Sequence, residues 1–268
     1  IENLDEDARA RTFRSLAALM NLKASPTDKK TQQLILQNTL IRRLETNLFD
    51  ADNIPLHKKA AIRGSEDALV FNVKSNQLPD KIPDSWQIQD NEDGSTSVIV
   101  NGELDVLFSD VRTSRVLAAG QLPTGFDPEA LYQSRNHPRG LQLAIYGASD
   151  ALNALGINWE IIKNHVPGDQ VSVYASSAMG QLDTHGSGGL LQASLLGKRV
   201  SSKNLPLGLA EMTADFVNAY ILGNVGTTGA NIGACATFLY NLRQGIQDIR
   251  SGKFRVSIIG GSEAPLTP

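Results

Sequence analysis

The sequence predicts an α/β layered fold over its second half, where helical and strand patterns alternate along the chain. Apolar residues recur at helical spacing in 139–155, and 159–165 is a shorter amphipathic helix. Two short apolar runs, 171–175 and 256–259, are typical of buried strands. We therefore expect a sheet covered by helices in this part of the chain.

The composition excludes several classes of protein. Of the 268 residues, 41% are hydrophobic and 20% are charged, with a formal net charge of −3. A chain of this length can bury a sizeable core, and without a basic excess nucleic acid is not an expected partner. No run of about 18 apolar residues occurs, so we expect no membrane span, and no signal peptide is visible. The single cysteine excludes a disulfide framework or a cysteine-rich metal site and suits a reducing compartment, so we expect a cytoplasmic protein.

Two helices are predicted at the start of the chain. The first runs from Leu4 to about Leu22, with apolar residues on one face. The second begins at Ser25-Pro26, and leucines at four-residue spacing extend it to about residue 48: Leu36, Leu40, Leu44 and Leu48. We interpret this helical pair as scaffold.

Strand patterns follow the helices. Leu69–Val73 predicts one strand, and Trp86–Ile88 predicts another, with a turn at Glu92-Asp93-Gly94. Ser97–Phe108 predicts a β-hairpin, because Asn101-Gly102 between two apolar runs is a strong turn signal. No residue in this region suggests chemistry by itself.

The remaining elements lead to the cysteine. A glycine-rich loop, 180–189, precedes a helix near 190–196, and a long apolar helix covers 205–222. We expect a strand from 225 to about 234 and a helix from Cys235 to about Arg250. Four apolar side chains are expected on the inner face of that last helix: Phe238, Leu242, Ile246 and Ile249.

Cys235 is the candidate nucleophile. A lone cysteine is often a small buried hydrophobe, but this one lies at a predicted strand-to-helix junction. Gly233, Ala234 and Ala236 leave space for a sharp turn and for a substrate, as in the nucleophile elbow of hydrolases. At a helix N-terminus the free N–H groups and the macrodipole favour the reactive thiolate, and the N–H of Cys235 can donate to an oxyanion. The residues alone leave the core and the catalytic interpretation open.

Several short motifs occur in one order along the chain. They are Gly125–Pro128, Ser134–Gly140, Ala148–Leu152, Val171–Ser177, Gly189–Ala193, Gly233–Thr237, and Gly260–Ala264 with Pro268. Over about residues 110–268 this series resembles the β-ketoacyl-acyl-carrier-protein synthases, which are condensing enzymes of the thiolase superfamily. Within that family it is most similar to the FabY-type initiating synthases of bacterial fatty acid synthesis, notably through the second and fifth motifs.

The resemblance implies a fold and a division of the chain. The fold is thiolase-like, with αβαβα layers, and residues 111–268 form the N-terminal half of the condensing domain, which carries the nucleophile. Residues 1–110 form an added helical pair and β-hairpin. Phe238 stands where many relatives have a small residue, so it either lines the acyl pocket as a substrate-binding residue or packs beneath the turn at Cys235.

The resemblance also implies a reaction. Cys235 accepts an acyl group from coenzyme A or acyl carrier protein, and malonyl-acyl-carrier-protein then loses carbon dioxide. The resulting carbanion attacks the thioester and gives a 3-oxoacyl product, a decarboxylative Claisen condensation by covalent catalysis. Neither a cofactor nor a metal is required. With a short donor such as acetyl-CoA, this is the initiating step of fatty acid biosynthesis.

Partners follow from the same resemblance: acyl carrier protein, the acyl and malonyl thioester substrates, and a second copy of the chain. We expect a homodimer through the strand at about Thr228–Ala234, because an exposed edge favours pairing, and a bulky residue at Asn231 should disturb it. Five basic residues are candidates for the face that docks the acidic carrier, with scattered surface charge as the alternative: Arg112, Arg115, Lys198, Arg199 and Lys203.

The chain departs from the family pattern at its histidines. The family uses two histidines that follow the nucleophile, together with a second oxyanion donor, whereas all four histidines here precede Cys235: His57, His137, His165 and His185. His185 is a weak catalytic candidate, and we expect His137 to form structural hydrogen bonds and His165 to cap a helix. The family's first core strand is not visible before Leu4. We therefore expect a piece of a longer polypeptide that does not catalyse condensation alone.

Three alternatives remain open. A thiolase or polyketide-type condensing enzyme would share the fold, and a non-catalytic partner subunit would typically lack the nucleophile. A thiol-redox protein needs a resolving cysteine, which this sequence does not contain. Nucleotide binding is not expected, because 223–233 has no dinucleotide fingerprint and 180–189 lacks the lysine of a phosphate loop.

Overall fold

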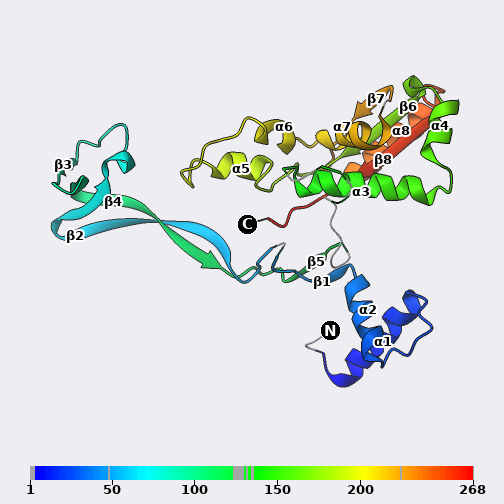
Figure 1. Ribbon diagram of the computed structural model, residues 1–268, viewed down its shortest axis with the longest axis horizontal. Helices are drawn as coiled ribbons and strands as arrows, with labels where there is room; N and C mark the ends of the chain where they lie inside the picture. The colour runs from blue at the N-terminus through cyan, green and yellow to red at the C-terminus, as the bar shows by residue number, and fades with distance from the viewer. Residues whose placement is uncertain are drawn as a thin grey trace. The chain divides into compact units, whose positions relative to one another are not determined.

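The computed structural model describes residues 4–47, 49–122, 130, 132–133, 136–223 and 225–267 (Figure 1). The motif residues 125–128, 134, 135 and 268 lie outside this description. Contacts divide the chain into two units. The first consists of residues 1–42 with 120–268, and the second consists of residues 43–119. Within the described residues, no helix combines the length and the apolar character needed to cross a membrane.

The predicted helical pair is formed by α1 (Glu6–Leu19) and α2 (Lys29–Asn38). Each helix begins at an aspartate, Asp5 or Asp28, whose carboxylate accepts a hydrogen bond from an amide of the first turn. Such N-caps satisfy donors that the helix itself cannot pair. The pair has a small core of its own, made by three buried residues: Phe13, Ala17 and Ile35.

The second helix is shorter than predicted. It ends at Asn38, and the next residues, β1 (Ile41–Arg43), are extended and pair with β5 (Ala118–Gly120). A strand far along the sequence thus provides the hydrogen-bond partners of this segment, a contact that local leucine spacing cannot report. Because Leu40 is 53% exposed while Leu44 is buried, the leucine stripe is not one face of a helix.

The second unit is an antiparallel sheet with the strand order β2-β4-β3, in which β2 and β4 form a long twisted ribbon (Figure 1). The strands are β2 (Ile54–Lys74), β3 (Trp86–Asp90) and β4 (Ser95–Arg112). The turn predicted at 92–94 joins β3 to β4, and Gly94 adopts a φ of +78° there. The strand predicted at 69–73 lies within β2.

The hairpin predicted at Asn101-Gly102 is wrong, because both residues lie inside β4. β2 pairs with β4 on either side of them, with a register shift between the pairs Arg63–Glu103 and Ala68–Asn101. Gly102 falls at this shift with a φ of +98°, a backbone conformation that glycine tolerates. The Asn-Gly pair therefore marks a shift of register within a continuous strand.

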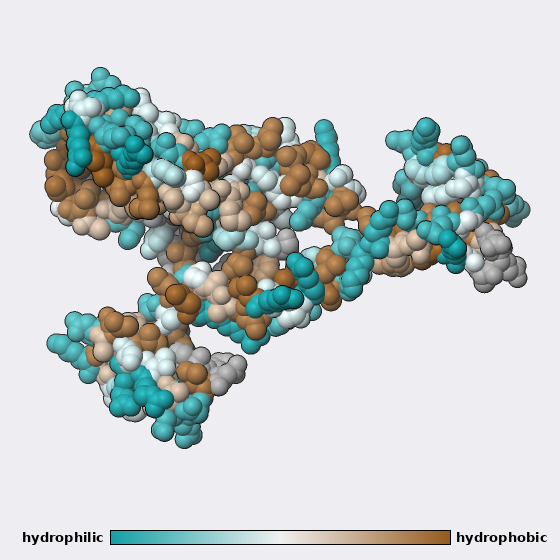
Figure 2. Space-filling model, turned by 180° about the vertical axis from the view of Figure 1, so that it is seen from behind, coloured by the Kyte–Doolittle hydropathy of each residue, from teal (hydrophilic) through white to brown (hydrophobic). Residues whose placement is uncertain are grey.

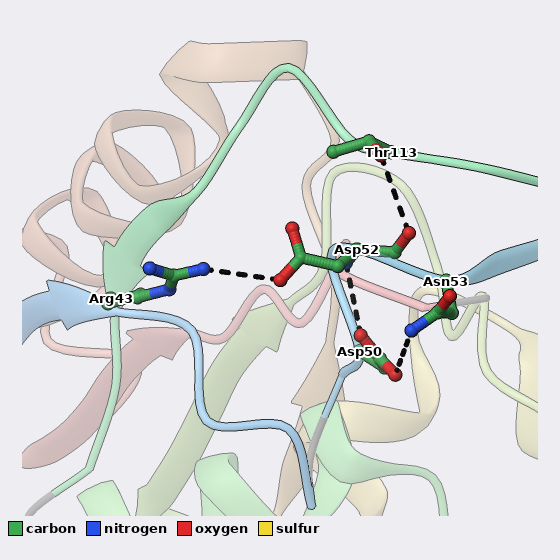
Figure 3. A network of polar contacts seen from close by, with 5 residues as sticks. All are labelled: Arg43, Asp50, Asp52, Asn53 and Thr113. Carbon is green, nitrogen blue, oxygen red and sulfur yellow. Dashed lines mark hydrogen bonds and ion pairs between the residues drawn. The ribbon is translucent and has the colours of Figure 1, made fainter.

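A polar network fixes the chain where it enters β2 (Figure 3). The Asp50 carboxylate accepts hydrogen bonds from Asn53 Nδ2 and from the N–H of Asp52, each at 3.0 Å, and these bonds lower the pKa of Asp50. The Asp52 carboxylate pairs with Arg43 at 3.2 Å, and the Asp52 carbonyl accepts from Thr113 Oγ1 at 3.4 Å. Because the ion pair is exposed, it orders the turn more than it stabilises the unit.

The other unit contains the predicted α/β layers. Its parallel sheet has the order β7-β6-β8, with β6 (Val171–Ser176), β7 (Thr227–Gly229) and β8 (Val256–Gly261). Its helices are α3 (Arg139–Ala154), α4 (Trp159–His165), α5 (Ser187–Gln192), α6 (Asn204–Gly208), α7 (Met212–Val217) and α8 (Thr237–Arg250). Of these elements, α3, α4, β6 and β8 agree with the predicted bounds to within two residues.

The central strand β6 is buried on both faces, and the two faces differ. Val173 and Ala175 belong to an apolar cluster with residues of α7, and α3 packs against the same cluster. Ser172, Tyr174 and Ser176 point the other way and form hydrogen bonds with side chains of β8 and α8. Since side chains alternate along a strand, β6 places an apolar layer on one side of the sheet and a polar layer on the other.

The long helix predicted over 205–222 is interrupted. It is replaced by α6, α7 and a π-helical turn, η4 (Asn218–Leu222), after which Gly223 adopts a φ of +80°. Between α6 and α7 the carbonyls of Gly208 and Ala210 accept hydrogen bonds from the N–H groups of Gln181 and Ser177 at 3.0 and 3.1 Å. The break in the helix therefore docks the glycine-rich loop that follows β6.

Candidate active site

Cys235 lies on a tight turn between the sheet and α8. The strand predicted to reach Ala234 is too long, because β7 ends at Gly229. Residues Ala234–Ala236 instead form a single 3-10 turn, η5, and α8 begins only at Thr237. Cys235 is exposed, so it is not a core hydrophobe of this unit. The turn is sharp because Ala234 has a φ of +48°, in the left-handed region that residues with a Cβ rarely adopt.

The Thr237 side chain stabilises this turn through two hydrogen bonds to its backbone. Its buried hydroxyl accepts a hydrogen bond from the N–H of Gly233 at 3.1 Å and donates one to the carbonyl of Ala234 at 2.7 Å. One side chain thus bonds the backbone on both sides of the left-handed residue. The sequence analysis did not predict this role, although Thr237 is the last residue of the motif Gly233–Thr237.

Gly233 lies in a closely packed position. A Cβ at this position would lie 2.0 Å from Cε2 of the Tyr240 ring, whereas ordinary contacts are 3.4–4 Å. The small residue expected beside the nucleophile therefore makes room for a side chain of α8, and any larger residue would displace either the ring or the turn.

The faces of α8 are the reverse of those predicted. The buried positions are polar or small: Thr237, Asn241, Gly245 and Asp248. Three of the four apolar residues expected to face inward are exposed: Phe238 (50%), Ile246 (41%) and Ile249 (43%). The reason is that β6 presents its polar face to α8, and that Gly245 allows α8 to approach β8 closely. Figure 2 shows hydrophobic residues reaching the surface over this unit, at the upper left.

A second buried polar contact lies further along α8. The Tyr174 hydroxyl donates a hydrogen bond to Asp248 Oδ2, and Gln244 Nε2 donates to Asp248 Oδ1 at 3.0 Å. Burial, reinforced by the Asp248 carboxylate, raises the pKa of Tyr174 to about 12. Tyr174 therefore stays protonated at neutral pH and serves as a donor that joins the sheet to the helix.

The histidines occupy structural positions. The His137 ring packs against Phe216 and Tyr220, with centroids 5.0 and 5.7 Å away, and burial lowers the pKa of His137. The hydrogen-bonding role expected for it is not seen at Nδ1, which has no partner among the described residues, because aromatic rings surround it. His165 Nδ1 lies 2.8 Å from the carbonyl of Ile161 at the end of α4, as a capping residue would.

His185 and the basic candidates lie on exposed segments. The N–H of His185 donates to Asp183 Oδ1 at 2.9 Å, and Asp183 Oδ2 accepts from the N–H of Arg139 at 2.6 Å, which ties the loop to α3. Three of the predicted docking residues are exposed between α5 and α6: Lys198, Arg199 and Lys203. The other two, Arg112 and Arg115, lie in the unit of residues 43–119.

A groove of about 490 Å³ opens beside the turn that carries Cys235. Its lining comes from the turn and from one face of α8: Ala230, Asn231, Ile232, Gly233, Tyr240, Arg243, Gln244 and Gln247. Among the described residues, no three His, Cys, Asp or Glu side chains are grouped so that they could hold a metal ion.

The layered α/β fold and the cysteine turn at the start of α8 are the features expected of a condensing-enzyme domain. Residues 112–268 match the family model described as "Beta-ketoacyl synthase, N-terminal domain", and the chain belongs to this family. Over its whole length it is 44% identical to the beta-ketoacyl-[acyl-carrier-protein] synthase FabY of Pseudomonas aeruginosa, of which it covers 45%. The crystal structure of the noncanonical ketosynthase FabY from P. aeruginosa matches with a TM-score of 0.83 and 43% identity, covering 100% of this chain and 44% of that chain.

More distant relatives belong to larger proteins. The fatty acid synthase subunit alpha of Saccharomyces cerevisiae is 26% identical over 87% of this chain, which covers 13% of the yeast protein. The chain thus spans less than half the length of these relatives. The predicted fold class and the resemblance to FabY-type synthases are confirmed. The division at residue 110 and the roles of Cys235 and Phe238 stay predictions.

Proposed function

We propose that the protein is a β-ketoacyl-acyl-carrier-protein synthase for the initiating condensation of fatty acid biosynthesis, with Cys235 as the acyl-carrying nucleophile. The main observation behind this proposal is that Cys235 is exposed on the turn η5 just before α8, which Thr237 stabilises. This turn lies within residues 112–268, which match the family model. The likeness to FabY supports the substrate class, since that relative is named for this activity.

The proposed chemistry has two steps. In the first, the Cys235 thiolate attacks the carbonyl carbon of acetyl-CoA, the coenzyme A thiolate leaves and takes up a proton, and an acetyl thioester remains on the enzyme. In the second, malonyl-acyl-carrier-protein loses carbon dioxide, its α-carbon bonds to the acetyl carbonyl carbon, and Cys235 leaves as thiolate. The N–H of Cys235 donates to the carbonyl oxygen when it becomes an oxyanion.

The rest of the machinery is proposed to lie outside residues 1–268. This includes the histidine pair that assists decarboxylation and the second oxyanion donor. The exposed apolar side of α8 supports this arrangement, because a further folded segment covering Phe238, Ile246 and Ile249 would gain about 25 cal/mol per Å² of apolar surface buried. Phe238 would then either line the acyl pocket or pack against that segment.

The proposed partners follow from the surface. Lys198, Arg199 and Lys203 form an exposed basic segment that suits an acidic carrier protein. β7 is one of the two edge strands of its three-stranded sheet, and we propose that it pairs in a homodimer. Light scattering on the full-length protein tests the dimer, and a monomer would refute it. We also propose the cytoplasm as the compartment, because an exposed free thiol suits a reducing environment.

The decisive experiment is intact mass of the full-length protein after incubation with acetyl-CoA, beside a Cys235→Ala variant. An acetyl adduct on the wild type alone supports the initiating synthase. An adduct formed only with longer acyl carriers keeps the class and rejects the initiating step. No adduct with any acyl thioester rejects the proposed function. Addition of malonyl-acyl-carrier-protein should then release carbon dioxide, whereas a thiolase would form its product without that release.

A further inference from the structure

The Asn241 side chain is the most completely bonded polar group on the inner face of α8. It has no exposed surface. Its Oδ1 accepts hydrogen bonds from the N–H and from Nδ2 of Asn231, at 2.9 and 3.2 Å. Its Nδ2 donates to Ser176 Oγ at 2.8 Å and to the carbonyl of Gly260 at 3.3 Å. One amide therefore joins α8 to β6, to β8 and to the segment that leads into the cysteine turn.

Ser176 completes a clamp around Asn231. Its hydroxyl receives the hydrogen bond from Asn241 and donates its own proton to the carbonyl of Asn231 at 3.1 Å. Both backbone polar groups of Asn231 are thus fixed, the N–H by Asn241 and the carbonyl by Ser176. Ser176 is itself fully buried at the end of β6, so the clamp is anchored in the centre of the sheet.

The clamp of Asn241 and Ser176 holds a segment that lies between β7 and the turn η5. β7 has ended at Gly229, and the 3-10 turn η5 begins only at Ala234, so residues 230–233 have no strand or helix to hold them. Within this stretch the structure fixes Asn231 through Asn241 and fixes Gly233 and Ala234 through Thr237. The path from the sheet to the left-handed Ala234, immediately before Cys235, therefore depends on side chains of α8.

The chemistry of the site calls for a carboxamide. One buried group must accept from a backbone N–H and donate to a hydroxyl at the same time, and Asn does both without charge. A leucine of similar size would leave the N–H of Asn231 and the Ser176 hydroxyl without these partners inside the protein, a state that buried polar groups avoid.

We propose that Asn241 is a positioning residue for Cys235, which it places by fixing Asn231 together with Ser176. This inference rests on the proposed function, because the placement matters for catalysis only if Cys235 is the acylated residue. Asn241 does not touch the substrate. It holds the backbone so that the thiol and the N–H of Cys235 keep one position relative to the acyl carbonyl.

The test uses two separate variants of the full-length protein, Asn241→Leu and Ser176→Ala. The serine variant removes only the bond to the Asn231 carbonyl and one partner of Asn241. The matched control is Asp248→Asn, a buried polar change on the same face of α8 whose bonds do not reach the turn. We expect kcat for acetyl transfer to fall about 10- to 100-fold in Asn241→Leu and less in Ser176→Ala, with KM for acetyl-CoA little changed. The control should lose thermal stability but keep its kcat.

Alkylation of Cys235 by iodoacetamide needs no acyl substrate. It therefore tests the positioning role of Asn241 separately from the proposed synthase function. A slower alkylation in both clamp variants, and not in the control, supports the positioning role even if the wild type is never acetylated. Alkylation and acetylation at wild-type rates in folded Asn241→Leu or Ser176→Ala would overturn it. If Asn241→Leu does not fold, Ser176→Ala decides alone. An equal loss of kcat in Asp248→Asn would also overturn it, by showing a general effect of destabilising α8.

Discussion

Replacement of Gly233 by alanine should disturb the cysteine turn through a single steric contact. Gly233 has a φ of −152°, outside the left-handed region, so the steric contact is the expected source of the effect. The added Cβ would lie 2.0 Å from Cε2 of Tyr240, and the ring would have to retreat by roughly 1.4 Å to reach ordinary contact. Because Tyr240 is half exposed, its ring can swing outward, and the cost falls at the low end for overpacking, about 1 kcal/mol.

Thermal unfolding and acetylation of the full-length protein measure the two consequences. A loss of about 1 kcal/mol lowers the unfolding midpoint by about 2–4 °C in a domain of 150–250 residues. Acetylation should slow by more than the stability loss suggests, because Gly233 belongs to the turn that places the thiol. A second substitution, Tyr240→Ala, removes the ring and should restore most of the acetylation rate to Gly233→Ala. A Gly233→Ala variant with wild-type rate and midpoint, or a double variant as slow as the single one, would refute the reasoning.

Three further predictions concern the contacts of α8 with the cysteine turn and with the sheet. Thr237→Val removes the hydroxyl and should cost about 1–3 kcal/mol by chemical denaturation, whereas Thr237→Ser should cost less; a larger loss in Thr237→Ser than in Thr237→Val would show that the methyl group matters more than the hydroxyl. Gly245→Val should lower the unfolding midpoint, because a Cβ there would lie 2.6 Å from Ser257 Oγ; an unchanged midpoint would mean that α8 is not held tightly to β8. The folded pKa of Tyr174 is raised to about 12 from 10.0, so the free energy of unfolding should decline as pH rises through this window. Denaturation in Tyr174→Phe should show a shallower decline, and an identical slope would contradict the raised pKa of Tyr174.

The elements that local chemistry defines were predicted well. α3 begins after a proline, and Gly156 follows its end with a φ of +69°, so its length could be read from residues within the helix and next to it. α4 and β6 likewise have bounds set by nearby patterns. Cys235 was identified as the candidate nucleophile from its small neighbours and from motif order.

The wrong predictions share one cause, which is a distant partner. The Asn101-Gly102 pair has the chemistry of a turn, but β2 pairs along both sides of it and keeps the strand continuous. The helix over 205–222 has unbroken apolar periodicity, but the loop after β6 uses two of its carbonyls and interrupts it. Periodicity reports what one segment can form, and pairing with another segment decides what it does form.

The sequence by itself determined the family and the layered fold class, and it predicted Cys235 as the nucleophile, because these follow from motif order and local pattern. Only the tertiary structure decided how that cysteine is held. The apolar stripe of α8 predicted the wrong inner face, since burial depends on which side of β6 the helix meets. Asn241 meets Ser176 and Asn231 only in the folded chain, so its role could not be read from spacing along the sequence.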